Sequence, residues 1–338
     1  MTALLTPERR LRRLELLITR RLDGLLHGGY LGLLPGAGSE PAGSREYRAG
    51  EDEVRWMDWS VTARTTVPHV RTVDADRELA TWVLVDGSAS MDFGTAEYEK
   101  RELAVGAVAA VGFLTTGTGN RLGGWLSSAS GTRRFPPRGG RTHLLGILRT
   151  LVEAPRGGPE AGVGARATAG VAAGAGAGMG AASGVGGLGV GGLAVGLGGI
   201  GRAVRRRGLI VVVSDFLDGL DEDGLGPGAP TWERPLRRLA HRHQVLAVHV
   251  TDPREHELPD VGMLPMVDPE TGRRREVPTA SRRLRERYAA AVGQQQASIA
   301  SALKRAGAAH LVLRTDRDWV ADIARHVLAQ RRLRGVRA

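Results

Sequence analysis

Short apolar runs of strand length alternate with helical patterns along most of this 338-residue chain, and this alternation constrains the fold more than any other feature. Residues 82–85 and 209–213 are continuous apolar runs of the kind that form parallel strands buried on both faces. Strands that alternate with helices predict an α/β fold with a doubly wound, mostly parallel sheet. The expected strands are 67–73, 82–85, 122–126, 209–213, 245–250 and 310–313; the expected helices are 98–114, one from just after 142 to 151, 232–241, 281–306 and 319–333; residues 263–277 resemble a hairpin.

An N-terminal extension, residues 1–79, precedes the α/β domain, which we place at residues 80–338. Its first element is a predicted helix at 7–26, with an apolar stripe of Leu11, Leu14, Ile18, Leu22 and Leu25 at helical spacing. We expect this stripe to dock on the body of the protein, although arginines on the other face leave open a helix on a membrane surface. Trp56 and Trp59 are expected to stabilise the join between the extension and the sheet.

A segment rich in glycine and alanine, residues 157–201, interrupts the α/β order. Because it offers little surface to bury, it is predicted to be a disordered insertion within the domain. Between Arg166 and Arg202 the chain carries no charge, which would suit a membrane span by length, but glycine supplies too little apolar surface. Residues 196–201 match the spacing of a dinucleotide-binding loop, but no apolar strand precedes them, so we discard that match.

The composition argues against three classes: proteins held by disulfides or zinc–thiolate sites, secreted proteins and specific nucleic-acid-binding proteins. Without cysteine the chain has neither disulfides nor zinc–thiolate sites, and its N-terminus lacks the long apolar stretch of a signal peptide. We therefore expect a cytoplasmic protein without a transmembrane segment. The net charge of +11 is nearly matched by arginines near the two ends, at positions 9, 10, 12, 13, 20, 21, 331, 332, 334 and 337. No aromatic platform accompanies this charge, so specific nucleic-acid binding is not favoured.

The residues that carry chemistry follow the first central strand. Asp86, Ser88 and Ser90 alternate in a tight turn, where one carboxylate and two hydroxyls can face a single small cation. Thr142 precedes a predicted helix and Asp215 follows a second apolar strand, so both are expected at the same edge of the sheet. Separately, each of these residues also suits an ordinary turn or helix cap. Together they predict a Mg²⁺ or Mn²⁺ site for binding a partner, not for catalysis.

This constellation resembles the metal-ion-dependent adhesion site of von Willebrand factor A domains, and that resemblance implies metal-ligand roles for Asp86, Ser88, Ser90, Thr142 and Asp215. Further motifs resemble the domain-of-unknown-function fifty-eight family, namely residues 38–40, 45–52, 58–64, 69–71 and 268–272. The family resemblance covers nearly the whole chain outside 157–201. It implies partnership with a MoxR-type AAA+ ATPase in a chaperone-like or complex-assembly role, with an unknown client protein.

Two other functions remain open. Asp86 at a strand end suits the nucleophile of a haloacid-dehalogenase-like phosphatase, with Asp215 and Asp218 holding Mg²⁺. That chemistry wants a second acid two residues after the nucleophile, where this chain has Ser88. The arginine clusters instead suit a basic scaffold that associates with membranes or nucleic acid.

Overall fold

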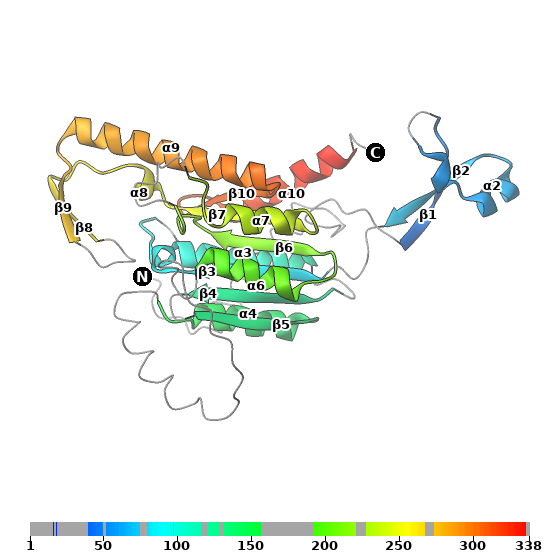
Figure 1. The fold of residues 1–338 in the computed structure, drawn as a ribbon, viewed down its shortest axis with the longest axis horizontal. Helices are drawn as coiled ribbons and strands as arrows, with labels where there is room; N and C mark the ends of the chain where they lie inside the picture. Colours follow the sequence, from blue (N-terminus) through cyan, green and yellow to red (C-terminus); the bar gives the residue numbers. More distant parts are fainter. Residues whose placement is uncertain are drawn as a thin grey trace, which may run out of the picture.

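The structure is a computed structural model, and it describes residues 16, 18, 40–49, 52–74, 80–96, 98–115, 120–128, 131–156, 192–220, 228–267 and 274–335. Its body contains one six-stranded sheet (Figure 1), formed by β3 (Thr81–Gly87), β4 (Leu122–Ser128), β5 (Gly131–Arg138), β6 (Leu209–Ser214), β7 (Gln244–Thr251) and β10 (Ala309–Arg314). The spatial order is β10, β7, β6, β3, β4, β5. All neighbours pair in parallel except β4 and β5. We call the edge where the five parallel strands end the carboxyl edge, and the opposite edge the amino edge.

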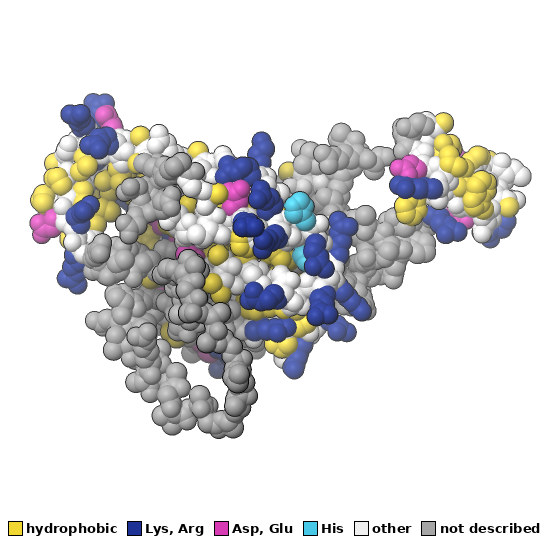
Figure 2. All heavy atoms as spheres, in the orientation of Figure 1, with side chains coloured by type: hydrophobic (Ala, Val, Ile, Leu, Met, Phe, Trp, Pro, Cys, Tyr) yellow, Lys and Arg dark blue, Asp and Glu magenta, His cyan; other side chains and the backbone are white. Residues whose placement is uncertain are grey.

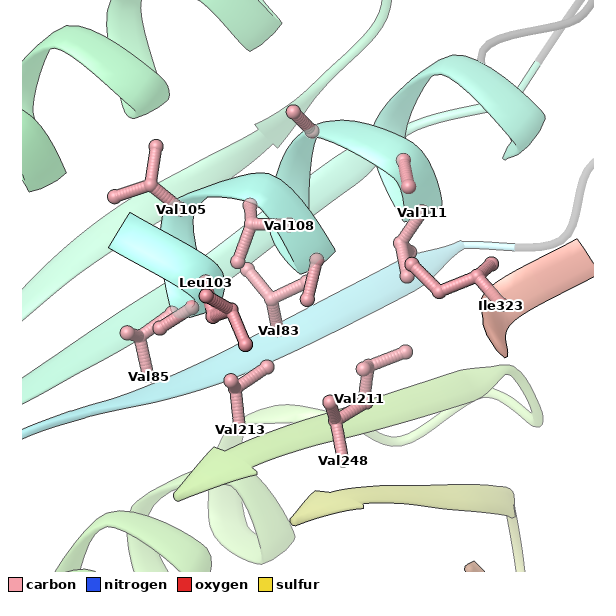
Figure 3. Close-up of a cluster of buried hydrophobic side chains, with 14 of the residues drawn as sticks. Val83, Val85, Leu103, Val105, Val108, Val111, Val211, Val213, Val248 and Ile323 are labelled. Carbon is pink, nitrogen blue, oxygen red and sulfur yellow. The ribbon is translucent and has the colours of Figure 1, made fainter. Parts of the chain in front are cut away.

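Helices cover both faces of the sheet because side chains along each strand point alternately to the two sides. Val83 and Val85 belong to one buried cluster, and Trp82 and Leu84 belong to a second. The first cluster is completed by α3 (Lys100–Thr115), α4 (Arg141–Val152) and α10 (Trp319–Gly335), and the second by α6 (Leu193–Ala203), α7 (Glu233–Ala240) and α9 (Arg282–Ala306). Figure 3 shows valines of the sheet meeting those of α3 in the first cluster. The prediction of a doubly wound, mostly parallel sheet is confirmed.

The predicted strands and helices of the domain all occur, with ends shifted by a few residues. The hairpin is present as β8 (Met263–Val267) paired with β9 (Arg274–Pro278). The antiparallel edge strand β5 was not predicted. Its sequence, with Arg133, Arg134, Pro136 and Pro137, lacks an apolar run, and only Phe135 of the strand is buried. None of the described helices is long and apolar enough to cross a membrane.

The prediction of disorder over 157–201 is wrong at its C-terminal end. Residues 193–203 form α6, and Leu193, Leu197 and Ile200 are each 2% exposed or less. The helix forms despite four glycines because its apolar residues fill the second cluster, and because Gly196 lets the backbone approach Leu84 closely. An added Cβ at Gly196 would lie 2.8 Å from Leu84 Cδ1. The dinucleotide-like motif at 196–201 is thus a packed helix. Residues 157–191 lie outside the described residues.

The N-terminal extension contributes a small unit and one core residue. β1 (Glu40–Glu46) pairs antiparallel with β2 (His69–Asp74), and η1 (Val54–Trp56) and α2 (Trp59–Thr65) lie between them. Trp56 and Trp59 are 51% and 65% exposed, so the expectation that they pack at a join with the sheet is wrong. Ile18 is helical and fully buried in the first cluster, in agreement with the predicted stripe. The rest of the predicted helix at 7–26 lies outside the described residues, apart from Leu16.

Candidate metal centre

Asp86 lies at the carboxyl edge, near the end of β3, with both side-chain oxygens hydrogen-bonded. Its Oδ1 accepts from the backbone N–H of Ser88 at 2.9 Å, and its Oδ2 accepts from the hydroxyl of Ser214 at 2.5 Å. Ser214 ends β6, so this contact joins the two central strands. The chain then enters a short 3-10 helix, η2 (Ala89–Asp92), which brings the hydroxyl oxygens of Ser88 and Ser90 within 3.1 Å of each other. The structure therefore places Asp86, Ser88 and Ser90 next to one another in the first predicted loop.

Asp215 follows β6 and lies beside this loop. Its Oδ1 accepts from the backbone N–H of Leu217 at 3.2 Å, and a hydrogen bond from Ser90 helps to lower its pKa. The next residue, Phe216, has φ of +59°, a conformation that is unfavourable for a bulky side chain. Phe216 is held there by complete burial and by its N–H, which donates to Ser214 Oγ at 2.9 Å. Packing thus fixes the direction of the Asp215 carboxylate.

Lys100, in the first turn of α3, is a central part of the site that the sequence analysis missed. Its side chain is fully buried, and Nζ donates to Asp215 Oδ2 at 2.8 Å and to Glu255 Oε1. Glu255 belongs to α8 (Pro253–His256), where it also accepts from the N–H of Asp252 in a capping box. The only sequence signal is a charged residue at the start of an apolar helix, and Arg101 and Glu102 beside it suggest an exposed turn.

A further buried acid, Asp252, stabilises the loops around the site. It is fully buried just beyond the end of β7, and its carboxylate accepts hydrogen bonds from Thr95 N, Thr95 Oγ1, Thr315 Oγ1 and Arg254 N at 2.6–2.9 Å. These bonds tie the loop before α3 to the ends of β7 and β10. The network from Asp86 to Asp252 therefore links four of the five parallel strands at one edge, which leaves its members little freedom to move.

The electrostatics of the site centre on three acids and one ammonium. Burial, and then repulsion from Asp215, raise the pKa of Asp86 to about 6. Burial opposes ionisation of Asp215 as well, but the Lys100 ammonium, together with hydrogen bonds from Ser90 and the Leu217 N–H, outweighs it and holds the pKa of Asp215 below its usual value. Burial raises the pKa of Glu255. The charge of Lys100 thus balances that of Asp215. Asp86 has no such partner among the described residues, so a bound cation would favour its ionised form.

Thr142, the remaining predicted ligand, lies at the opposite edge, so its assignment to this site is wrong. Because β5 runs antiparallel, its last residue, Arg138, pairs with the first residue of β4, Leu122. The neighbour of Thr142, His143, has its Nε2 3.0 Å from the carbonyl oxygen of Leu122. Asp86 pairs with Ser127, five residues further along β4, which corresponds to about 17 Å of strand. Thr142 is an exposed residue in the first turn of α4, at the amino edge.

Asp218, which the phosphatase hypothesis places on Mg²⁺, has another role in the structure. Its Oδ2 accepts from the backbone N–H of Leu193 at 2.6 Å, so it caps the start of α6. Position 88 supplies a hydroxyl and not a general acid, and both oxygens of Asp86 are already engaged. The geometry therefore gives no support to Asp86 as a phosphatase nucleophile.

The four residues that converge fit a small hard cation. Oxygen ligands about 2.0–2.1 Å from Mg²⁺ lie about 3 Å apart at neighbouring octahedral positions. The 3.1 Å between the hydroxyls of Ser88 and Ser90 agrees with that spacing. Asp86 and Asp215 are buried, whereas both serines are partly exposed, so the site opens to solvent on the hydroxyl side. In the described part of the chain no three His, Asp or Glu side chains form a metal cluster, so a cation here would depend on hydroxyl and water ligands.

Comparison with known proteins gives a match over most of the chain. Residues 43–298 match the family described as "Protein of unknown function DUF58". The chain is similar to "Uncharacterized protein Rv1480" of Mycobacterium tuberculosis (strain ATCC 25618 / H37Rv), with 47% identity over 322 residues, 95% of this chain and 89% of the relative. The sequence match therefore extends across nearly the full length of both proteins.

Two solved structures are similar at much lower sequence identity. BatB from Bacteroides thetaiotaomicron is 12% identical with a TM-score of 0.37, covering 75% of this chain and 99% of that one. A von Willebrand factor type A protein from Catenulispora acidiphila is 12% identical with a TM-score of 0.35, covering 78% of this chain and 44% of that one.

Proposed function

The chain belongs to the DUF58 family, and on that premise we propose that it is a non-catalytic, metal-dependent protein-binding module of the cytoplasm. One observation carries the proposal. Asp86, Ser88, Ser90 and Asp215 converge at the carboxyl edge, and a buried network holds them there. When bound, Mg²⁺ or Mn²⁺ would supply a Lewis-acidic point that attracts an anionic oxygen of a partner.

The protein's own groups favour binding over catalysis. Asp86 and Asp215 would hold the cation from the buried side, and Ser88 and Ser90 from the exposed side. Two neutral hydroxyls leave a cation more electron-poor than carboxylates would, which favours capture of a carboxylate from another protein. The Lys100 ammonium is enclosed between Asp215 and Glu255 and has no exposed surface, so it is not available as an acid or base towards a bound molecule.

We propose a MoxR-type AAA+ ATPase as the partner, in complex assembly or remodelling of a client protein. The support is the family resemblance of the motifs at 38–40, 45–52, 58–64, 69–71 and 268–272. An ATPase that presents an acidic side chain to the carboxyl edge would complete the coordination of the cation. Binding would then be lost when either the cation or Asp86 is removed.

The test is a calorimetric titration of the MoxR-type ATPase into the full chain, with Mg²⁺ and with EDTA. Asp86→Ala should abolish the Mg²⁺-dependent binding. The control is Glu286→Ala, which removes an exposed acid of α9 whose ion pair is with Arg282. Equal affinity of wild type and Asp86→Ala, with and without EDTA, would overturn the metal-bridged mechanism. A direct titration of Mn²⁺ into each variant shows whether the cation site or the partner contact has failed.

A further inference from the structure

A second charged surface lies at the amino edge, away from the metal centre. Two neighbouring segments form it: the connection between α6 and β6, and the outer side of α7, which packs beside α6. We define the basic face by the six exposed arginines of these segments: Arg205, Arg206, Arg207, Arg234, Arg237 and Arg238. Figure 2 shows Lys and Arg side chains spread over this part of the molecule, with few acids among them.

The positive charge of the basic face is not neutralised by any ion pair within the described part of the chain. None of its six arginines makes an ion pair with a described residue, whereas Arg101, Arg149 and Arg285 elsewhere in the body each pair with an acid. Glu233, next to Arg234 in the chain, is already paired with Arg305 at 2.8 Å. Arg242 adds another guanidinium, with its Nη2 3.4 Å from the carbonyl oxygen of Arg205. The electrostatic potential over this face is therefore positive in the folded protein.

His243 lies close to these arginines and is affected by their charge. Burial lowers its pKa, and the charges of Arg242 and Arg207 lower it further. Mutual repulsion of this kind works against folding unless solvent, salt or a partner screens it. The arginine clusters noted in the sequence lie at the chain ends, whereas this one is assembled from segments about 30 residues apart.

The shape and composition of the face favour one kind of anion. None of the exposed large hydrophobic side chains of the described chain lies on α7 or on residues 204–208. Trp232, the aromatic residue next to α7, is fully buried. A single nucleic-acid strand would need exposed aromatics for stacking. A broad, outward-facing surface of guanidinium groups instead suits a flat array of phosphates, which arginine binds through paired hydrogen bonds.

We propose that the basic face docks the protein peripherally on a membrane surface rich in anionic phospholipid. The attraction is electrostatic and requires no insertion of apolar side chains. The contact is reversible and salt-sensitive, since each arginine contributes through the surface potential of the lipid. With the basic face at the amino edge, the metal centre at the opposite edge stays free for a protein partner.

The test is cosedimentation of the full chain with vesicles of phosphatidylcholine and of phosphatidylcholine mixed with phosphatidylglycerol, at low and high ionic strength. We expect binding only to the mixed vesicles at low ionic strength. In the variant Arg205→Gln/Arg206→Gln/Arg207→Gln the partition coefficient should fall roughly fivefold per arginine, on the order of a hundredfold in all. The variant Arg234→Gln/Arg237→Gln/Arg238→Gln should behave in the same way.

The matched control is Arg283→Gln/Arg287→Gln/Arg317→Gln, which removes three exposed arginines from the start of α9 and the turn after β10, at the carboxyl edge. It should retain most of the vesicle binding, and thermal unfolding should show that all three variants fold. An equal loss in the control would overturn the proposal, because net charge alone would then explain the binding. Failure to bind the mixed vesicles, or a face-dependent affinity for duplex DNA without vesicle binding, would overturn it as well.

Discussion

The two edges of the central sheet use charge in opposite ways. At the carboxyl edge, Lys100 is buried between Asp215 and Glu255, and Asp86 is bonded to Ser88 and Ser214. At the amino edge, the arginines of the basic face point into solvent, with no ion pair to any described acid. At the carboxyl edge, hydrogen bonds and ion pairs hold the charged groups in fixed positions. At the amino edge, the charged side chains are exposed and have no such contacts with described acids.

This difference separates two kinds of recognition. A buried network places oxygens to within a few tenths of an ångström, so it can select a ligand by size and coordination. A set of exposed arginines recognises a ligand through long-range electrostatic attraction. Its binding therefore depends on the charge density of the ligand surface and on the salt concentration. Substitutions at the carboxyl edge should therefore change stability, whereas equivalent substitutions at the amino edge should change association.

The sharpest comparison is the same substitution at both edges. Lys100→Met would leave Asp215 and Glu255 buried without their shared cation, and we expect a loss of about 3–5 kcal/mol in the free energy of unfolding. Lys304→Met, at the exposed C-terminal end of α9 near the amino edge, should stay within about 0.5 kcal/mol of wild type. Urea unfolding measures both. Similar values for the two variants would contradict the division between the edges.

The metal centre gives the next largest effect. A cation that binds only the native state, at about a hundred times its Kd, adds about 2.7 kcal/mol to the free energy of unfolding. Asp86→Ala and Ser88→Ala should lose this gain in Mg²⁺ or Mn²⁺, whereas Thr142→Val at the amino edge should keep it. Thermal unfolding with each cation and with EDTA checks this. If Thr142→Val removed the gain, Thr142 would belong to the site, against the register of β5.

A buried histidine near the carboxyl edge, His249, should make the stability of the protein depend on pH, whereas an exposed histidine at the amino edge should not. Burial, and then the neighbouring His310, lower the pKa of His249 to about 3. Between that value and its ordinary pKa of about 6.5, the unfolded chain binds a proton that the folded chain does not, so stability falls as pH falls. From pH 7 to pH 5 this histidine should account for a loss of about 2 kcal/mol.

The variant His249→Gln should lose correspondingly less stability over the same pH change. His241→Gln, an exposed position at the amino edge, serves as the control and should retain the wild-type difference. Urea unfolding at the two pH values measures the difference directly. An identical pH dependence in His249→Gln and wild type would show that His249 titrates in the folded protein much as it does in the unfolded chain.

The sequence predicted the carboxyl edge well because parallel strands end together. Asp86 and Asp215 each follow a continuous apolar run, and two central parallel strands bring such positions side by side. Thr142 was misplaced for a related reason. The strand before it, β5, is an edge strand with arginines and prolines, so its pattern does not indicate a strand. One unrecognised antiparallel strand moves the start of the next helix to the other edge.

Two further features depend on tertiary contacts that no local pattern reveals. Lys100 precedes Arg101 and Glu102, which is the composition of a solvated helix start, and only the fold brings Asp215 and Glu255 onto its ammonium. The composition of α6 suggests disorder because glycine disfavours helix, yet burial of Leu193, Leu197 and Ile200 outweighs that preference. The basic face is likewise assembled from separate segments, so the distribution of charge along the chain did not indicate it.

The smallest predicted effect concerns α6, which begins at the Asp218 cap on the carboxyl edge and ends at Ala203 beside the basic face. Alanine suits a helix better than glycine by about 1 kcal/mol, so Gly198→Ala, whose Cβ would meet only Arg202 Nη1 at 3.5 Å, should stabilise the protein by about 0.5–1 kcal/mol. Gly196→Ala places its Cβ 2.8 Å from Leu84 Cδ1 in a closed core, where overpacking typically costs about 1–3 kcal/mol. We therefore expect Gly196→Ala to destabilise the protein by about 1 kcal/mol, with the opposite sign from its neighbour two residues away. Urea midpoints at constant slope measure both variants. If both were stabilised, α6 would not pack as closely on β3 as the structure shows, and the connection it makes between the two edges would be looser.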